Sequence, residues 1–251
     1  MSIEIWRVDL DRCQLALEEA ERASSSLSDP EVVRGAAISA PLERARWRTG
    51  HIALRLLLER TCGPPVKRMP FGMAPGGRPE LDGVPVSFSL SHSGDVALIA
   101  IGSSARGPIG IDVECTRVIR MSLERRARLE DYAMQLAPHC ALPAVPDSRL
   151  LQSWVRIEAY AKASGEGVGM TLTAAGVIGS PRGQAAGRPR GDGPQRAHST
   201  GLPSSGMTVR DLDMDAGYYG ALAAPQLPET LNVKAFPWDG DGVKSLLLGH
   251  P

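Results

Sequence analysis

The sequence predicts an α+β protein made of two similar halves. Segments that alternate like strands and segments with helical periodicity occur in both parts of the chain, and each half ends in a predicted hairpin. This repeated order suggests two related units that meet near Gly107. With 251 residues the chain is long enough for either one large domain or two smaller ones. We therefore expect an N-terminal half over residues 1–106 and a C-terminal half over residues 107–251.

The N-terminal half begins with a strand followed by helices. Ile3–Leu10 alternates enough for a strand, and Leu15–Ala23 predicts a helix that ends before Pro30. Pro41–Arg60 is the most helical segment, because proline stands in its first turn and glycine follows soon after its end. A loop rich in glycine and proline is expected at Pro70–Pro85.

Two stripes run along the helix predicted at Pro41–Arg60 when successive residues are placed about 100° apart. The first stripe is apolar, is expected to face the core, and contains Trp47, Leu54 and Leu58. The second stripe is basic and contains Arg44, Arg48, His51 and Arg55. A solvated helix face is the ordinary interpretation of a basic stripe, and an anion-binding site is the functional one.

A hairpin and an acidic strand follow. In "VSFSLSHSGDVALIAIG" apolar residues alternate with serines up to a turn at Ser93–Asp95, and Val96–Ile101 returns as a buried strand. In "GPIGIDVECTR" the alternation of a strand places Asp112 and Glu114 on one face, opposite an aliphatic face. The acidic face also carries Gly110.

The C-terminal half continues with helices at Met121–Leu136 and Ser148–Ser164, and closes with strands around a turn at Asp215–Gly217. Between them, residues 176–206 are rich in glycine and proline and poor in aliphatic side chains. We expect this segment to be a flexible insertion.

Charge and composition exclude several classes of protein. The 28 basic residues equal the 28 acidic ones, which argues against a nucleic-acid partner. The four cysteines are widely scattered, and no apolar stretch is long enough to cross a membrane. Since "MSIEIWRVDLDRC" lacks a basic segment followed by an apolar one, we expect no signal peptide. We expect a cytoplasmic protein with reduced thiols and no membrane contact.

Three features together predict chemistry at a phosphate. Asp112 and Glu114 share a strand face, Glu158 and Lys162 are neighbours on a helix, and His92 stands in "SLSHSGD". Each alone has an ordinary structural interpretation: a solvated strand, a helical ion pair, a turn histidine. Together, three carboxylates form an oxygen-rich site that suits Mg²⁺, and the nearby bases complement phosphate charge.

The chain resembles the 4′-phosphopantetheinyl transferases of the surfactin-synthetase-activating (Sfp) type. Motifs of that family occur in order, G-(K/R)-P at Gly77–Pro79, F-x-(I/L)-S-H-S at Phe88–Ser93 and G-(I/V)-D-(I/V)-E at Gly110–Glu114. The fourth motif, W-x-x-K-E-(A/S)-x-x-K-x-x-G-x-G, stands at Trp154–Gly167. The resemblance covers roughly Arg44 to Gly167 and implies two halves packed as an intramolecular pseudo-dimer.

The resemblance also implies an activity: transfer of 4′-phosphopantetheine from coenzyme A to a serine of an apo acyl or peptidyl carrier protein, with 3′,5′-ADP as the other product. It implies that Asp112, Glu114 and Glu158 hold Mg²⁺ or Mn²⁺ on the pyrophosphate. Glu158 would then remove the proton of the carrier serine, and Lys162 would stabilise the pyrophosphate charge. Gly110 would leave room for a phosphate. The enzyme is expected to act as a monomer.

Contacts to the rest of coenzyme A follow from the same resemblance. His92 and the region of Arg44 and Arg48 would bind its phosphates, and Arg78 with the backbone of Ser89–Ser91 would flank the nucleotide. One position departs from the family, because Ile157 stands where lysine is usual. Either that lysine is dispensable or Arg156 takes its place.

Other functions remain open at this point. A short trimeric holo-acyl-carrier-protein synthase resembles only one half, which the length of this chain disfavours. A metal-dependent phosphodiesterase or nuclease also uses D-x-E with lysine, although the neutral charge and 4% aromatic content disfavour it. A non-catalytic protein that binds carriers would be favoured by loss of Asp112, Glu114 or Glu158, and all three are present.

Overall fold

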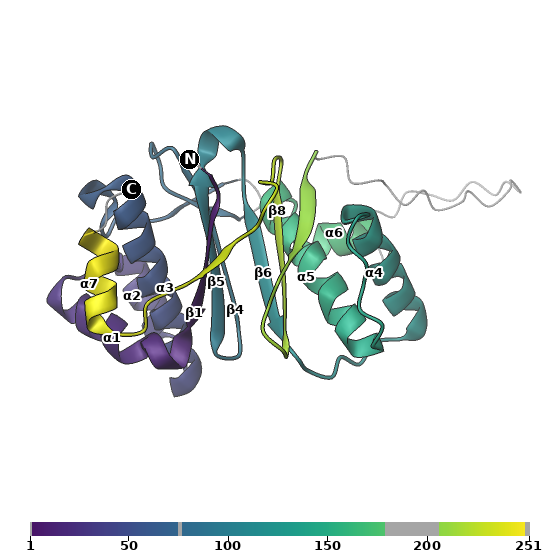
Figure 1. Ribbon diagram of the computed structural model, residues 1–251, viewed down its shortest axis with the longest axis horizontal. Coiled ribbons are helices and arrows are strands. Elements are labelled where there is room, and N and C mark those ends of the chain that lie inside the picture. The colour runs from purple at the N-terminus through teal and green to yellow at the C-terminus, as the bar shows by residue number, and fades with distance from the viewer. Residues whose placement is uncertain (1, 75–76, 179–205, 249–251) are drawn as a thin grey trace, which may run out of the picture.

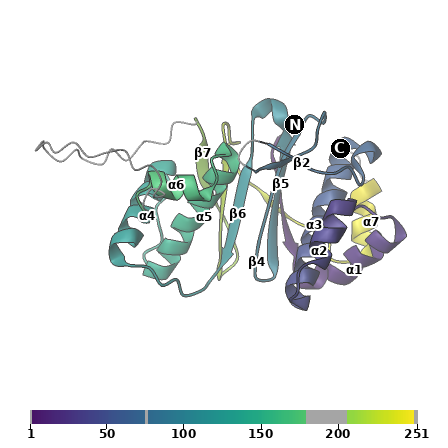
Figure 2. The same cartoon turned by 180° about the vertical axis from the view of Figure 1, so that it is seen from behind.

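The computed structural model describes residues 2–74, 77–178 and 206–248. Helices cover the outer faces of two sheets that pack against each other, as Figures 1 and 2 show from opposite sides. The predicted α+β class is confirmed. Among the residues described, no helix is both long and apolar enough to cross a bilayer.

The N-terminal half supplies one helical layer and most of one sheet. Its elements are β1 (Glu4–Asp9), α1 (Leu10–Ala23), α2 (Asp29–Ala36), α3 (Pro41–Cys62), β2 (Gly72–Met73), β3 (Pro79–Glu80), β4 (Val86–Ser93) and β5 (Val96–Ser103). The predicted hairpin corresponds to β4 and β5, which pair antiparallel and place His92 opposite Ala97.

The C-terminal half supplies the second sheet and its helices. Its elements are β6 (Gly110–Cys115), α4 (Leu123–Leu136), α5 (Pro146–Ser164), α6 (Val168–Ala174), β7 (Thr208–Leu212), β8 (Tyr218–Ala224), β9 (Val233–Ala235) and α7 (Gly240–Leu248). The acidic strand is β6, and the helix with Glu158 and Lys162 is α5. Residues 179–205 of the expected insertion lie outside the described residues.

Six α-helices and strands were not expected from the sequence: α2, β2, β3, α6, β9 and α7. The helix α2 does have a local sequence signal, because Ser28 and Glu31 form a capping box and Pro30 stands in its first turn. The last two connect the ends of the chain, because β9 pairs parallel with β1 and α7 packs on α1 and α3. The C-terminal residues therefore return to the N-terminal sheet, while the division at Gly107 stays a prediction.

The core consists of three layers of apolar side chains. A four-stranded sheet has the order β4-β5-β1-β9, and a three-stranded sheet has the order β6-β8-β7. One apolar cluster fills the space between the first sheet and α1 and α3, and another lies between the second sheet and α4 and α5. Between the sheets, alternate residues of β5 and β6 interdigitate, among them Leu98 and Ile111. Each sheet is thus packed against helices on its outer face.

Serine side chains join the two sheets along β4 and β6. The Ser89 hydroxyl accepts a hydrogen bond from the Ile111 amide at 3.1 Å. Further along, Ser91 donates to Asp112 at 2.7 Å and Ser93 donates to Glu114 at 2.8 Å. Because β4 and β6 are edge strands of their sheets, these hydroxyls satisfy polar groups that no neighbouring strand reaches. The serine motif therefore orients both carboxylates.

The close approach of α5 to β6 requires glycine at position 110. A Cβ atom there would lie 2.0 Å from the Ala159 carbonyl oxygen and 2.5 Å from the Ala163 amide nitrogen. The glycine motif thus serves helix packing, which differs from the phosphate space that the resemblance implied. It brings Lys162 on α5 next to the acidic face of β6.

We expect Gly110→Ala to lower the free energy of unfolding by about 1–3 kcal/mol, because backbone atoms of α5 cannot move aside without shifting the helix. Urea unfolding measures this difference. Gly169→Ala is the control, since nothing lies within 4 Å of a Cβ atom there. An equal effect of the two substitutions would contradict the packing role of Gly110.

Candidate active site

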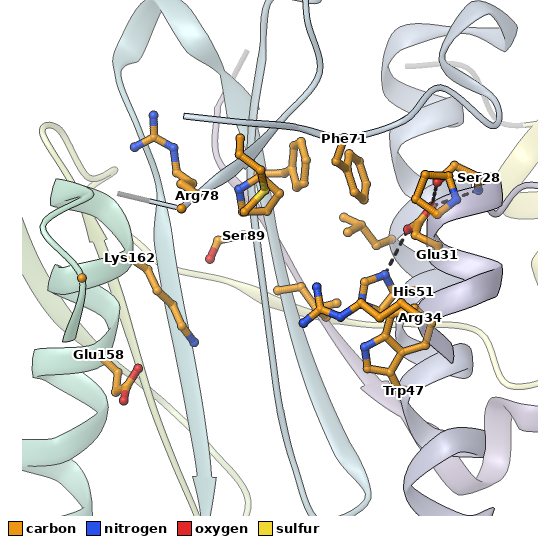
Figure 3. Close-up of a pocket in the computed structure, with 18 of the residues that line it drawn as sticks. Ser28, Glu31, Arg34, Trp47, His51, Phe71, Arg78, Ser89, Glu158 and Lys162 are labelled. Carbon is orange, nitrogen blue, oxygen red and sulfur yellow. Dashed lines mark hydrogen bonds and ion pairs between the residues drawn. The ribbon is translucent and has the colours of Figure 1, made fainter. Parts of the chain in front are cut away.

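A cleft of about 540 Å³ separates the two helical layers near the serine motif of β4. One wall comes from α5, which presents Glu158 and Lys162. The opposite wall comes from α2 and α3, with Arg34 and His51 (Figure 3). Side chains of β4 lie between these walls. The cleft therefore brings residues of both halves to one place.

Lys162 forms an ion pair with the buried carboxylate of Asp112. Its ammonium donates to Asp112 Oδ1 at 2.6 Å, to Ser91 Oγ at 3.1 Å and to the Ile111 carbonyl at 3.2 Å. Burial raises the pKa of the Asp112 carboxyl, and the Lys162 ammonium opposes this shift. The predicted partners Ser91, Asp112 and Lys162 thus form one hydrogen-bonded cluster.

Glu158 lies one helical turn before Lys162 and lines the cleft. Among the described residues its carboxyl group makes no hydrogen bond or ion pair. Burial and the nearby Asp112 carboxylate raise the pKa of Glu158 to about 7. A carboxyl group with such a pKa can accept a proton near neutral pH, which is the property of a general base.

Glu114 lies further along the acidic face of β6. It accepts a hydrogen bond from Ser93 at 2.8 Å and forms an ion pair with Arg117 at 2.8 Å. The Glu114 carboxylate contributes to the raised pKa of Glu158. The three carboxylates predicted to act together therefore influence one another electrostatically across the interface of α5 and β6.

The donor chemistry of this cluster suits Mg²⁺, which prefers carboxylate oxygens. Burial and repulsion from the Asp112 and Glu114 carboxylates raise the pKa of Glu158, and a bound cation would relieve that repulsion. In the described part of the chain, however, no three His, Cys, Asp or Glu side chains are arranged to hold a metal ion. Asp112 and Glu114 are instead neutralised by Lys162 and Arg117.

Aromatic and basic side chains build the opposite wall. His51 stacks on Trp47 with ring centroids 3.8 Å apart, and both line the cleft. Arg34 of α2 lies beside them (Figure 3). Sequence reasoning placed His51 in the basic stripe but did not find Arg34, because α2 was not expected.

The predicted coenzyme A contacts are not all placed in the cleft. Arg78 lines it, and its guanidinium donates to the Ala163 carbonyl at the end of α5 at 3.2 Å. Arg48 pairs with Glu18 through two hydrogen bonds of 2.8 and 2.9 Å, and neither Arg44 nor Arg48 belongs to the cleft wall. His92 is exposed at the end of β4. The structure therefore favours Arg78 over Arg44 and Arg48.

The position where the family carries lysine is part of the core. Ile157 is fully buried in the apolar cluster between α5 and the second sheet. Arg156 is also fully buried, and it pairs with Asp211 at 2.7 and 2.6 Å. Since its guanidinium points into the protein and not toward the cleft, Arg156 does not replace the missing lysine.

The sequence is similar to several proteins that are all named 4′-phosphopantetheinyl transferases. No family model matches the chain. A protein of Synechocystis provisionally named a 4′-phosphopantetheinyl transferase is 30% identical over 66% of this chain and 65% of its own length. The 4′-phosphopantetheinyl transferase AcpT of Salmonella typhi is 35% identical over 49% of this chain and 60% of its own. The 4′-phosphopantetheinyl transferase Sfp of Bacillus subtilis is 24% identical over 93% of this chain and 98% of its own.

The first two matches span less than two thirds of the relatives' own lengths, at 65% and 60%. All three relatives carry the name of the class that the motifs of this chain resemble. The similarity therefore points to the same class of enzyme as the cleft residues of α5 and the neighbouring carboxylates of β6.

Proposed function

We propose that this protein is a 4′-phosphopantetheinyl transferase, which moves 4′-phosphopantetheine from coenzyme A to a serine of an apo carrier protein. The observation that carries the proposal is the juxtaposition of Glu158, whose pKa is raised to about 7, with the Ser91–Asp112–Lys162 cluster at the cleft. A base beside a fixed ammonium is what attack of a hydroxyl on a phosphate requires. The names of the relatives support this class.

In the proposed reaction the carrier serine attacks the β-phosphate of coenzyme A. The new bond joins the serine oxygen to this phosphorus, and the bond from the phosphorus to the bridging oxygen of the pyrophosphate breaks. The electron pair of the broken bond leaves with 3′,5′-ADP, and the serine proton passes to Glu158. Lys162 would donate to the pyrophosphate, while Arg78 would contact the nucleotide from the far end of the cleft.

Asp112, Glu114 and Glu158 are the residues that would hold Mg²⁺ in this proposal. When bound there, the ion would neutralise negative charge on the pyrophosphate. The remaining chemistry falls to side chains of this protein. Ser91 and Ser93 keep the two strand carboxylates oriented through hydrogen bonds of 2.7 and 2.8 Å.

The proposal is tested by incubating the protein with coenzyme A, Mg²⁺ and several apo carriers from fatty-acid, polyketide and peptide synthesis. Intact-mass analysis should reveal addition of one phosphopantetheine group to at least one carrier. A carrier in which the acceptor serine is replaced with alanine is the control. If no apo carrier of the panel gains mass, the proposed function is wrong.

Removal of divalent cations should stop the transfer, because Asp112, Glu114 and Glu158 then repel the pyrophosphate and one another. We expect no holo carrier in the presence of EDTA, and recovery after addition of excess Mg²⁺ or Mn²⁺. The same mass measurement follows both steps. Undiminished transfer in metal-free buffer would contradict the proposed metal requirement.

A further inference from the structure

One buried carboxylate, that of Glu31, organises the cleft wall opposite the catalytic cluster. Its Oε2 atom accepts hydrogen bonds from the amide and hydroxyl of Ser28 at 2.9 and 2.6 Å and from Arg55 at 2.9 and 2.5 Å. Its Oε1 atom lies 3.0 Å from His51 Nδ1. Although burial alone would raise the pKa of Glu31, bonds from His51 and Arg55 lower it to about 2. The carboxylate therefore stays ionised at neutral pH.

The contact with Glu31 determines how His51 presents its ring. A carboxylate at Nδ1 favours a hydrogen on that nitrogen and leaves Nε2 for another partner. Stacking on Trp47 at 3.8 Å fixes the plane of the ring. Within the described residues no side chain or backbone group bonds to Nε2, and His51 lines the cleft. Glu31 and Trp47 thus fix the imidazole ring, and among the described residues its Nε2 atom has no hydrogen-bond partner.

The surroundings of His51 suit a nucleotide. Arg34 lies beside the imidazole ring (Figure 3), and Trp47 adds aromatic surface to this wall. Phe71 and Phe88, with ring centroids 4.9 Å apart, also line the cleft. The Arg55 guanidinium stacks 3.7 Å over the Phe71 ring and also donates a hydrogen bond to Glu31. Arg55 therefore connects the Phe71 ring to the Glu31 carboxylate. A cation, an imidazole and aromatic faces match the phosphates and base of a nucleotide better than the flexible pantetheine arm.

We propose that Glu31 is a positioning residue for the nucleotide end of the substrate. It holds His51 against Trp47 so that Nε2 and the Arg34 guanidinium together contact a phosphorylated adenosine. Glu31 acts through His51 and does not touch the substrate. This inference rests on the proposed function, since it takes coenzyme A as the substrate.

The test compares two buried glutamates of the same half. Glu21 also holds a loop, because its carboxylate accepts from Ser26 N at 2.8 Å and from Leu27 N at 3.3 Å, yet it does not line the cleft. We expect Glu31→Gln to weaken binding of 3′,5′-ADP about tenfold, the cost of one misdirected hydrogen bond. Glu21→Gln should stay within about twofold of the parent. Isothermal titration of the full chain measures both.

Further measurements separate positioning from general loosening of the fold. Binding of 4′-phosphopantetheine should change by less than about twofold in Glu31→Gln, and kcat at saturating coenzyme A by less than about threefold, because the catalytic cluster lies on the opposite wall. His51→Phe keeps a ring on Trp47 but removes both nitrogens, and it should weaken 3′,5′-ADP about tenfold. The double variant should be no weaker than His51→Phe alone, since both changes remove the same contact.

The outcomes are distinguishable. Unchanged 3′,5′-ADP binding in Glu31→Gln, an equal loss in Glu21→Gln, or multiplied losses in the double variant would each overturn the positioning role. If Glu31→Gln does not fold, the His51→Phe variant tests the proposal instead. Unchanged affinity of that variant for 3′,5′-ADP would overturn it. A parent protein that binds neither coenzyme A nor 3′,5′-ADP would overturn the proposed function together with this inference.

Discussion

Replacement of Glu158 with glutamine is expected to lower kcat for carrier modification by at least about 10²-fold, the contribution of a general base. Glutamine keeps the shape of the side chain but cannot accept the serine proton. Burial and Asp112 raise the pKa of Glu158 to about 7, so the parent carboxyl group is suited to take that proton near neutral pH. Coenzyme A affinity should change little, because Lys162 and the opposite wall of the cleft remain. Initial rates of holo-carrier formation and isothermal titration measure these two quantities.

Glu166→Gln is the matched control for this substitution. Glu166 is an exposed carboxylate just beyond the end of α5, so its replacement changes the net charge equally without altering the cleft. Its rate should stay within about twofold of the parent, as is usual for a solvated surface residue. If Glu158→Gln bound coenzyme A normally and still transferred at nearly the parent rate, Glu158 would not be the base.

Replacement of Arg156 with methionine is expected to lower the free energy of unfolding by about 2–3 kcal/mol. This is below the cost of breaking a fully buried ion pair, because Arg156 is buried but the Asp211 side chain that it leaves behind is 26% exposed. Arg156 is fully buried and also donates to the Cys140 carbonyl at 3.0 Å. Among the described residues, its loss leaves the Gln152 amide as the remaining side-chain donor to Asp211, at 2.7 Å from Oδ1. Urea unfolding measures the difference.

Two further variants sharpen the Arg156 experiment. Arg48→Met breaks a pair with Glu18 in which both side chains are 27% exposed, and should cost about 1 kcal/mol or less. A double variant, Arg156→Met with Asp211→Leu, should regain most of the stability, because apolar side chains can replace a buried ion pair. A loss in Arg156→Met no larger than in Arg48→Met would contradict the structural role. Loss of transfer with unchanged stability would instead make Arg156 the substitute for the missing lysine.

Much of the fold was predictable because its signals are local. Serines that alternate with Val86 and Phe88 predict the first strand of the hairpin, and the same period predicts that Asp112 and Glu114 share a face of β6. Proline in its first turn and glycine after its end delimit α3 well. Such signals depend on residues only a few positions apart, so one sequence is enough to read them.

Short elements were not predicted, because their stability comes from distant partners. The strand β9 has three residues and exists through its pairing with β1, more than 200 positions earlier in the chain. The helix α2 has eight residues, and Arg55 of α3 binds the Glu31 carboxylate of its capping box. Helices this short are marginal alone, so tertiary contacts decide whether they form.

The sequence by itself determined the α+β class, the acidic face of β6 and the placement of Glu158 and Lys162 one turn apart on α5. Only the tertiary structure decided which charged side chains face the cleft. Arg48 is bound by Glu18, Arg156 by Asp211, and Lys162 by Asp112. The physical reason is that the partner of a charged side chain depends on which carboxylate the packing of distant elements brings within hydrogen-bond distance, and periodicity along the chain does not contain that information.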